Sequence, residues 1–489
     1  HRNQLFLPLI VALLITGCKT YEARLLIPLE ILEEVEASRN LLSAVSPRLE
    51  AGQGNQKMDP IPLSRDPSLP TGFSQMARWM ALYSPELQRA RAEYEQAHSV
   101  AQIDTPLPNP EISMGPLIGT RLGPGATHKI QPAVDFGFSL PLNNRLFKND
   151  RILQAKEEEA YVNLVVTHRK LYLRLRSLYI EWILSEKKFR IQEEVRDSSL
   201  KSLDLTNRMV KAGIASALDQ GLMELESVQQ EAHRLEAESR CIETEEELSR
   251  IMGVSLETVR AAFSFQLPSL EKPLPDLHEA KAIMVGNHPG LALLRARYAV
   301  AEKELCLAVA EQYPDLQLGT SYEGDPGDAR KVWGLSIGIA LPLFDRNQQG
   351  IAEAEAEREK VRTAYSALLN ESLATLEGLY ERFALANKKY TLLRDSVLPR
   401  SEANLNAALQ SIRSGTIDSL KYLEVERTLR SLLIEVVSVE MEIRQRLNDV
   451  EQVMGVPLVL FPFETEEEFP YLMDWDETIK NETRNCAAE

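Results

Sequence analysis

The segment FGFSLPLNNRLF at residues 136–147 decides the fold, because a similar segment, IGIALPLFDRNQ, occupies residues 337–348. Pro141 in the first segment matches Pro342 in the second, 201 positions later. Three further matches follow at offsets of 202 to 204: Ser84-Pro85 with His288-Pro289, Lys211-Ala212-Gly213 with Arg413-Ser414-Gly415, and Met252-Gly253-Val254 with Met454-Gly455-Val456. A nearly constant offset over such a span indicates that one structural unit has been duplicated.

The residues before each Leu-Pro-Leu alternate with a period of two, which predicts a strand with two unlike faces. In the second unit we expect the apolar members to face lipid: Trp333, Leu335, Ile337 and Ile339. We expect the small residues between them to line a pore: Gly334, Ser336 and Gly338. Each unit is predicted to hold a β-hairpin, at 111–142 and 315–343. The length of its strands is close to that of a tilted membrane-spanning strand, which needs about 9–11 residues.

A very long helix is predicted after each hairpin. Residues 144–212 contain 69 positions without Pro or Gly, and the counterpart at 346–414 has the same length. At a rise of about 1.5 Å per residue, each helix would extend roughly 100 Å. Heptad spacing predicts coiled-coil packing on one face, through Leu164, Leu171, Leu175, Leu178, Trp182 and Phe189. Apolar residues outside this seam predict that a second face is also covered: Tyr172, Tyr179, Ile183 and Leu184.

Each long helix is predicted to end at a glycine that starts a tight turn into a shorter helix. The whole chain then divides as follows: a signal peptide at 1–18, an N-terminal arm and linker at 19–70, the first repeat at 71–254 with its shorter helix at 215–252, a linker at 255–276, the second repeat at 277–456 with its shorter helix at 417–454, and an acidic tail at 457–489.

The N-terminus has the pattern of a secretory signal. An apolar core at 5–17 is too short to span a bilayer as a stable helix, and it ends at Ile15-Thr16-Gly17-Cys18. The small residues before Cys18 resemble a bacterial lipobox, in which the cysteine is acylated and becomes the mature N-terminus. An ordinary cleaved signal with an incidental cysteine is the alternative.

Composition argues against several classes of function. The net charge of −17 repels phosphate backbones, so nucleic acid is not an expected partner. The sequence has no HExxH, Walker loop or GxSxG motif, and its histidines are scattered. We therefore predict no enzyme activity, no cofactor and no metal site. A disulfide between Cys241 and Cys306 is left open, because sequence cannot establish it.

Duplicated units of short helix, hairpin, very long helix, glycine turn and shorter helix, behind a lipobox, resemble the TolC family of outer-membrane efflux channels. The resemblance covers about residues 71–456. The segment LPLFDRNQQGIAEAEAE at 341–357 is most similar to the heavy-metal cation branch, which partners resistance-nodulation-division pumps. The fold class is then mainly α with a small membrane β part.

Physical reasoning supports part of the architecture that this resemblance implies. Four strands cannot close a barrel, and an open sheet edge cannot lie in lipid. Closed membrane barrels begin at about eight strands, so chains must share one. The resemblance implies a homotrimer with a 12-stranded β-barrel, continuous with a long α-helical barrel.

The resemblance also implies partners and site residues. The chain would be a lipid-anchored protein of the outer membrane of a Gram-negative-type bacterium, extending into the periplasm, where it meets a periplasmic adaptor (a membrane fusion protein) and an inner-membrane pump. The expected adaptor contacts are the tips of the helical hairpins: Lys211, Gly213 and Leu218, with Arg413, Gly415 and Leu420. The expected periplasmic gate is formed by Asp418, Lys421 and Glu424.

The predicted function is the outer-membrane channel of a tripartite efflux system, which passively conducts heavy-metal cations to the exterior. One alternative is a channel for drug efflux or type I protein secretion. Another is a coiled-coil lipoprotein that tethers the cell envelope, which accounts for the heptads but not for strands that face lipid.

Overall fold

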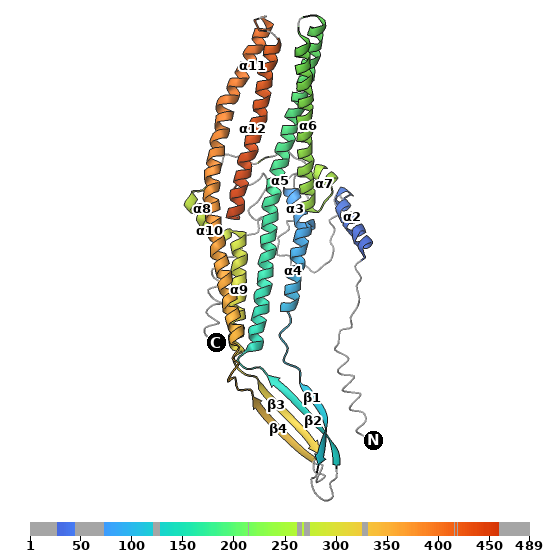
Figure 1. The fold of residues 1–489 in the computed structure, drawn as a ribbon, viewed down its shortest axis with the longest axis vertical. Helices are drawn as coiled ribbons and strands as arrows, with labels where there is room; N and C mark the ends of the chain where they lie inside the picture. Colours follow the sequence, from blue (N-terminus) through green and yellow to red (C-terminus); the bar gives the residue numbers. More distant parts are fainter. Residues whose placement is uncertain are drawn as a thin grey trace. The chain divides into compact units, whose positions relative to one another are not determined.

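The computed structural model describes residues 27–44, 73–120, 128–213, 215–261, 267, 274–324, 331–414, 416, 417 and 419–458. The chain divides into two compact units, His1–Leu49 and Glu50–Glu489. The first unit contains one described helix, α2 (Pro28–Ala44), which lies in the predicted N-terminal arm. The second unit contains both repeats, and the rest of the fold is described within it (Figure 1).

The two repeats have the same order of elements. The first repeat and the segment after it contain α3 (Phe73–Tyr83), α4 (Pro85–Ala101), β1 (Glu111–Thr120), β2 (His128–Leu140), α5 (Arg145–Lys211), α6 (Ala217–Met252) and α7 (Leu256–Ala261). The second repeat contains α8 (Leu277–Asn287), α9 (Pro289–Ala310), β3 (Leu316–Gly324), β4 (Lys331–Ile339), α10 (Gln348–Leu392), a π-helical turn η1 (Leu393–Val397), α11 (Leu398–Arg413) and α12 (Ser419–Met454).

The four strands form one antiparallel sheet in the order β1-β2-β3-β4, so the two predicted hairpins pair side by side. Pro116 lies in β1 directly opposite Pro132 of β2. Neither proline can donate a backbone hydrogen bond, and β1 is an edge strand, where proline is tolerated. The β2–β3 pairing begins at Ala133, one residue after Pro132, so that proline has a strand neighbour on one side only.

Left-handed asparagines connect the strands to the long helices. Asn143 and Asn144 have φ of 59° and 54°, and Asn347 has φ of 57°. Asparagine enters this region of backbone space more readily than most residues, because its short side chain bonds locally. The side-chain amide nitrogen of Asn347, Nδ2, donates to Ala308 O and to Glu311 Oε2, both at 2.9 Å. In both repeats the polar end of the repeated motif therefore supplies the residue before the helix, since Asn144 and Asn347 are the N-cap residues of α5 and α10.

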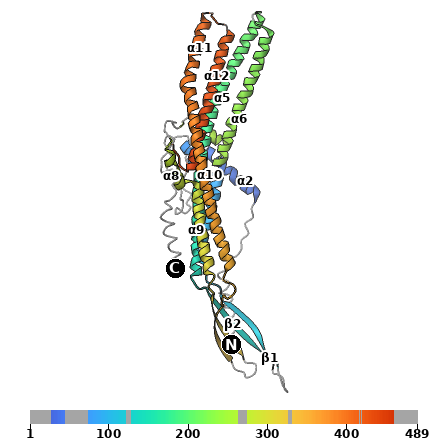
Figure 2. The ribbon, with the colours of Figure 1, turned by 60° about the vertical axis from the view of Figure 1, so that its left-hand side comes forward.

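Helix α5 is the centre of the helical layer. It packs against α4 and α9 along its first part and against α6 and α12 along its second part (Figures 1 and 2). The predicted seam residues Leu164, Leu175 and Trp182 are buried, and so are the residues predicted to face a second partner, such as Tyr179 and Leu184. Both apolar faces of α5 are covered because the helix lies between other helices rather than at the edge.

The second long helix differs from our expectation of a continuous helix over 346–414. The structure divides it into α10, the π-helical turn η1 and α11. Pro399 lies two residues after η1, and it has no N–H to continue an α-helical ladder. The sequence argument compared only the lengths of the two segments, so it did not take account of Pro399.

Two joints connect the short helices of each repeat. Helices α3 and α4 meet at Ser84-Pro85, and α8 and α9 meet at His288-Pro289. In each case proline occupies the first turn of the second helix, where its missing N–H leaves no hydrogen bond unmade.

A glycine at the end of each repeat lies against its joint. A Cβ on Gly253 would be 2.5 Å from Tyr83 O, and a Cβ on Gly455 would be 2.2 Å from Asn287 O. Both glycines also have left-handed backbones, with φ of +70° and +74°. The repeated Met-Gly-Val is therefore explained by close backbone contact together with a positive φ.

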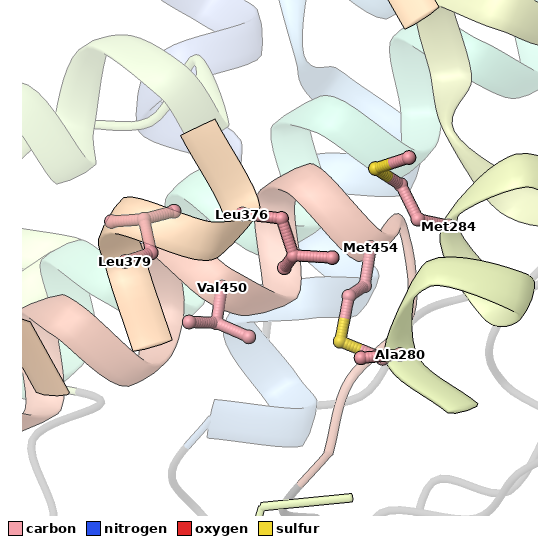
Figure 3. Close-up of a cluster of buried hydrophobic side chains, with 6 residues drawn as sticks. All are labelled: Ala280, Met284, Leu376, Leu379, Val450 and Met454. Atoms are coloured by element: carbon pink, nitrogen blue, oxygen red, sulfur yellow. The ribbon is translucent and has the colours of Figure 1, made fainter. Parts of the chain in front are cut away.

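A buried hydrophobic cluster of the second repeat joins three helices near the second joint, and Figure 3 shows its side chains. They are Ala280 and Met284 of α8, Leu376 and Leu379 of α10, and Val450 and Met454 of α12. This cluster packs α10 and the C-terminal end of α12 against the short helix α8.

The two cysteines of the described helices are not joined by a disulfide, which answers the possibility left open by sequence. Cys241 is buried on α6, and burial raises the pKa of its thiol to about 12. A thiol with so high a pKa stays protonated and acts as a packed side chain.

Candidate functional site

One face of the sheet is apolar on all four strands. Residues directly opposite in an antiparallel pair share a face, so the pairing register defines this face across the whole sheet. Among the residues of this face whose side chains the structure describes, all except Thr320 are apolar or aromatic, and they include Ile112, Met114, Val134, Phe136, Phe138, Leu140, Leu316, Leu318, Tyr322, Trp333, Leu335, Ile337 and Ile339. We call this set the apolar sheet face.

The apolar sheet face is open in the single chain. Trp333, Leu335 and Ile337 are 77%, 78% and 69% exposed, and Tyr322 packs against Trp333 with ring centroids 4.8 Å apart. An exposed apolar patch of this kind marks contact with a membrane or another protein.

On the opposite sheet face, the residues whose side chains the structure describes are small or polar, except for Val332. Gly334, Ser336 and Gly338 lie on it, together with Ser113, Asp135, Gly137, Ser139, Gln317, Gly319 and Ser321. The Ser113 hydroxyl donates to Asp135 Oδ2 at 3.4 Å. The residues predicted for lipid and for the pore are thus separated by the sheet, and the assignment of each face remains a proposal.

The first predicted adaptor tip is the turn between α5 and α6. Lys211 is exposed at the end of α5, and Gly213 follows with φ of +74°. Leu218, in the first turn of α6, is 72% exposed. Ser216 and Asp219 form a capping box, and their hydrogen bonds lower the pKa of Asp219. The described residues of the tip therefore present a cation and an apolar side chain to their surroundings.

The second predicted tip is the turn between α11 and α12. Arg413 ends α11 and Leu420 lies at the start of α12. The predicted residues Gly415 and Asp418 lie outside the described residues.

Two of the three predicted gate residues form an ion pair within α12. Lys421 Nζ and Glu424 Oε2 are 2.7 Å apart, with side chains 61% and 65% exposed. The carboxylate that Lys421 meets is one turn away on its own helix. A single exposed pair of this kind is worth about 0–1 kcal/mol in one chain.

The structure also shows polar links that sequence reasoning missed. Three of them join α12 to the first helical hairpin: Arg430 to Glu194 at 3.4 Å, the Ser198 hydroxyl to Glu426 at 3.2 Å, and Arg427 to Glu226 at 3.2 Å. Their partners are about two hundred positions apart, and no spacing rule in sequence connects them.

Three sets of elements, the strands, the helices next to the sheet and the helices farthest from it, each form a row with two ends. In the sheet the order runs from β1 to β4. The proximal helices contact in the order α4, α5, α9, α10, and the distal helices in the order α6, α5, α12, α11. A first-repeat element lies at one end of each order and a second-repeat element at the other.

Helix α6, at one such end, carries a second apolar stripe. Its buried positions include Ser227, Ala237, Cys241, Thr244 and Leu248, and α5 is the helix with which α6 packs most extensively. Exposed apolar residues lie on the opposite side with mainly heptad-like spacing: Leu218, Leu222, Leu225, Val228, Leu235 and Ile242. Apolar residues at such spacing favour packing against a further helix.

The predicted acylation site, Cys18, lies outside the described residues. Among the helices that the structure describes, none is long and apolar enough to cross a membrane. In the same part of the chain, no group of His, Cys, Asp and Glu residues is arranged to hold a metal ion.

Comparison with known proteins finds a family match within the second repeat. Residues 284–456 match the family model described as outer membrane efflux protein. The match covers most of the second repeat, in agreement with the resemblance seen in the sequence.

Individual similarities extend this result to the whole fold. CusC, a protein that forms a transmembrane channel, superposes with a TM-score of 0.61 at 13% identity, covering 83% of this chain and 99% of that one. The outer membrane channel CmeC of Campylobacter jejuni gives 0.63 at 14% identity, covering 90% and 98%. The predicted fold class, a duplicated TolC-like unit, is confirmed.

A relative in sequence is the cobalt-zinc-cadmium resistance protein CzcC of Cupriavidus metallidurans. It is 23% identical over 275 residues, which cover 56% of this chain and 65% of that protein. The alignment thus spans slightly less than two thirds of the relative.

Proposed function

We propose that this protein is the outer-membrane channel of a tripartite efflux system. It passes heavy-metal cations passively from an inner-membrane pump of the resistance-nodulation-division class, through a periplasmic adaptor, to the exterior. The observation that carries the proposal is the apolar sheet face, which continues over all four strands while the opposite face is polar. A sheet with these two faces suits a wall between lipid and water.

The matching edges support assembly into a closed ring. Edge strands β1 and β4 have unpaired backbone groups, which lipid does not tolerate. Pairing β4 of one copy with β1 of the next satisfies them, and the same head-to-tail contact brings α6 of one copy against α11 of its neighbour. The exposed stripe on α6 is then buried. We propose three copies, because four strands from each of three chains give the 12-stranded barrel that the resemblance implies.

Paired substitutions on β4 test the two faces. A charged side chain in contact with lipid at the membrane midplane costs about 2–4 kcal/mol, and one in the lumen much less. Ile337→Arg should therefore reduce the yield of heat-resistant trimer more than its neighbour Ser336→Arg does. Conductance of purified trimers in a planar bilayer measures the channel itself. The reverse order of yields, or intact trimers without conductance, would contradict the proposal.

The heavy-metal cargo rests on the similarity to a cobalt-zinc-cadmium resistance protein and on the motif at 341–357. Deletion of the gene should lower the tolerated concentrations of zinc, cobalt and cadmium salts. The tolerated concentrations of detergents and antibiotics, measured in the same strain, serve as the control. Sensitivity to drugs alone would favour the alternative of drug efflux.

Anchoring at Cys18 is proposed from the lipobox-like segment that ends there. Radioactive palmitate should label the wild type and not Cys18→Ser. Equal labelling of both proteins would exclude acylation at Cys18.

Adaptor docking is proposed at both hairpin tips. Exposed Lys211 and Leu218 support it at the first tip, and the repeated basic-x-Gly pattern extends it to Arg413, Gly415 and Leu420. Lys211→Glu with Arg413→Glu should leave trimers intact and abolish efflux. Loss of trimers together with efflux would indicate a role in folding instead.

A periplasmic gate is proposed at the start of α12, where three-fold symmetry triplicates every charge. The Lys421–Glu424 pair would then hold part of the ring, with Asp418 next to it. Asp418→Ala with Glu424→Ala should raise single-channel conductance and weaken block by divalent cations. Unchanged conductance and block would exclude both acids from the gate.

A further inference from the structure

The duplication repeats contacts between helices as well as sequence. In the first repeat, His98 of α4 lies 2.6 Å from Glu157 of α5. The corresponding positions, 204 and 201 residues further on, are Glu302 of α9 and Arg358 of α10, which are 3.4 Å apart. The basic and acidic partners are exchanged, but the contact is kept. The offsets between the repeats therefore predict which positions meet.

The same offsets can be applied to the contact between the two repeats. Helix α5 of the first repeat packs against α9 and α12 of the second repeat. The counterpart of α5 is α10 with α11, and the counterparts of α9 and α12 are α4 and α6. In a single chain these counterparts lie at opposite ends of the two helical rows. In the proposed ring, the contact between neighbouring copies is therefore the counterpart of the contact between the repeats.

Three polar contacts of α5 with the second repeat transfer to pairs of opposite charge. They are Arg297–Glu159 at 3.0 Å, Lys187–Glu440 at 3.2 Å and Ser198–Glu426 at 3.2 Å. We use an offset of 204 for α4, 202 for α6, 201 for the second long helix before η1 and 202 after it. The offset changes at η1 because a π turn accommodates one extra residue. The transferred pairs are Glu93 with Lys360, Glu238 with Lys388, and Glu224 with Arg400.

The cations of two pairs are available in the single chain. Lys388 and Arg400 are exposed, and neither forms an ion pair with another described residue. Residue 389 is also lysine, so the charge at this level does not depend on where the offset changes. Three other ion pairs of α5, namely Lys156–Glu304, Arg176–Glu451 and Arg430–Glu194, transfer to positions where one partner is uncharged: Val100, Ser249 and Val228. The transfer therefore brings no like charges together at these contacts.

Exposed apolar residues on the two helices fit the same register. On α6, Glu224 and Glu238 lie on one heptad-spaced face with exposed Val228, Leu235 and Ile242.

On α10, Lys388 lies on one face with Leu385 and Leu392, which are 69% and 59% exposed. Because the two helices are antiparallel in the ring, setting Lys388 opposite Glu238 brings Leu392 to Leu235 and Leu385 to Ile242, each to within one residue. Charge and apolar spacing thus give one register independently.

We propose that α10 and α11 of one copy pack along α6 of the next copy in this register, with Lys388 against Glu238 of the partner subunit, Leu392 against Leu235 of the partner subunit, and Arg400 against Glu224 of the partner subunit. Nearer the sheet, Lys360 of α10 meets Glu93 of the partner subunit. The register rests on the proposed ring of copies, and it adds which residues hold neighbouring copies together. Charges beside an apolar seam select partner and alignment more than they add stability.

Disulfide formation between copies tests the register. Cys241, Cys306 and Cys486 are first replaced by serine, and Leu392→Cys is then combined with Leu235→Cys. Oxidation of the purified protein should give covalent dimers and trimers on a denaturing gel without reductant. Leu392→Cys with Ile242→Cys is the matched control, because residue 242 is two helical turns from residue 235. The first pair should give at least about fivefold more cross-linked protein, since a disulfide requires Cα atoms within about 7 Å.

The outcomes separate this register from the proposed function. Trimers that cross-link equally through the control pair, or that do not cross-link through the first pair, would overturn the register and leave the channel proposal standing. A parent protein that forms no trimer would overturn both.

Reversal of one charge pair gives a second test that leaves the apolar seam intact. Glu224→Arg and Arg400→Glu should each lower the fraction of trimer at low ionic strength by at least about threefold, because like charges then meet at three contacts in each ring. The two changes together should restore the wild-type fraction. Glu236→Arg, which is exposed on α6 outside the stripe, should leave it unchanged. Losses that add in the combined variant would contradict the pairing, and this test decides if the cysteine variants do not assemble.

Discussion

The two joints between short helices have the same backbone and different caps. At the first joint Ser84 is buried, makes no cap hydrogen bond, and its hydroxyl has no partner among the described residues. At the second joint His288 Nδ1 accepts from the N–H groups of Gly290 and Leu291, at 3.1 and 3.2 Å. Its Nε2 lies 3.3 Å from the hydroxyl of Ser372.

What the joints share is the proline that starts the helix and the glycine packed against the kink. Duplication has kept these two features and changed the side chain between the helices. The difference indicates that the kink depends on space for the backbone, since a Cβ on either glycine would overlap a carbonyl oxygen. The cap is an additional contribution that one joint has and the other does not.

The largest effect is expected from adding a Cβ at the shared glycines. Gly253→Ala and Gly455→Ala should each lower the free energy of unfolding by about 2 to 5 kcal/mol, since overpacking and a left-handed alanine both cost energy. Thermal unfolding followed by circular dichroism measures the loss.

Gly213→Ala is the matched control for this prediction. Gly213 has the same left-handed φ, +74°, but no atom lies within 4 Å of the position of a Cβ. It should cost only about 1–2 kcal/mol. Equal losses at Gly213 and Gly455 would show that backbone conformation matters and close contact does not.

A smaller effect is expected from removing the caps. His288→Ala should cost about 1 kcal/mol, as for other N-caps. Ser84→Ala should change stability by less than about 0.5 kcal/mol, because its hydroxyl makes no hydrogen bond that would be lost. The difference in Tm between these two variants measures the asymmetry of the joints. Similar Tm values would mean that the His288 bonds contribute nothing.

The smallest effect concerns pH. Burial and, secondarily, the charge of Lys170 lower the pKa of His288, and its cap requires the neutral ring. The unfolded chain therefore takes up a proton first, so the stability from this residue is full above pH 6.5 or so and falls as the pH drops. Because solvent screens the partly buried ring, the free energy of unfolding should fall by less than about 1 kcal/mol between pH 7.5 and 6.0 through His288.

His288→Asn keeps a capping side chain that does not titrate and should flatten this part of the profile. His168 is buried and lies near cations: burial, with the charges of Arg91 and Arg169, lowers its pKa to about 4. Its contribution is common to both proteins and cancels in the comparison. Profiles that coincide for the variant and the wild type would exclude His288 as the source.

Much of the fold could be predicted because the sequence contains two copies of the same structural unit. The alternation before Leu-Pro-Leu predicted β2 and β4, and the run without Pro or Gly predicted α5 to within a residue at each end. The prediction of one continuous second long helix was wrong in detail, because a π turn at Leu393–Val397, two residues before Pro399, interrupts it and helical periodicity does not reveal such a turn.

The candidate sites were predictable where a single element defines them. The period of two is enough to sort Trp333 and Ser336 onto opposite faces of β4, and a glycine after a long helix is enough to mark a hairpin tip. Contacts between distant segments were not predictable, such as Arg430 with Glu194 or Arg427 with Glu226. They depend on how α12 lies across the first hairpin, which local spacing does not encode.

The sequence by itself determined the duplication, the kinds of elements and their order, because these follow from residue periodicity and backbone preference along a continuous segment. Only the tertiary structure decided how the two repeats join. Buried Arg176 of α5 meets buried Glu451 of α12 at 3.4 Å, and Glu451 also accepts the Leu458 N–H at 2.7 Å. A buried charge needs a charged partner, but only the packing of helices far apart in the chain selects which one it meets.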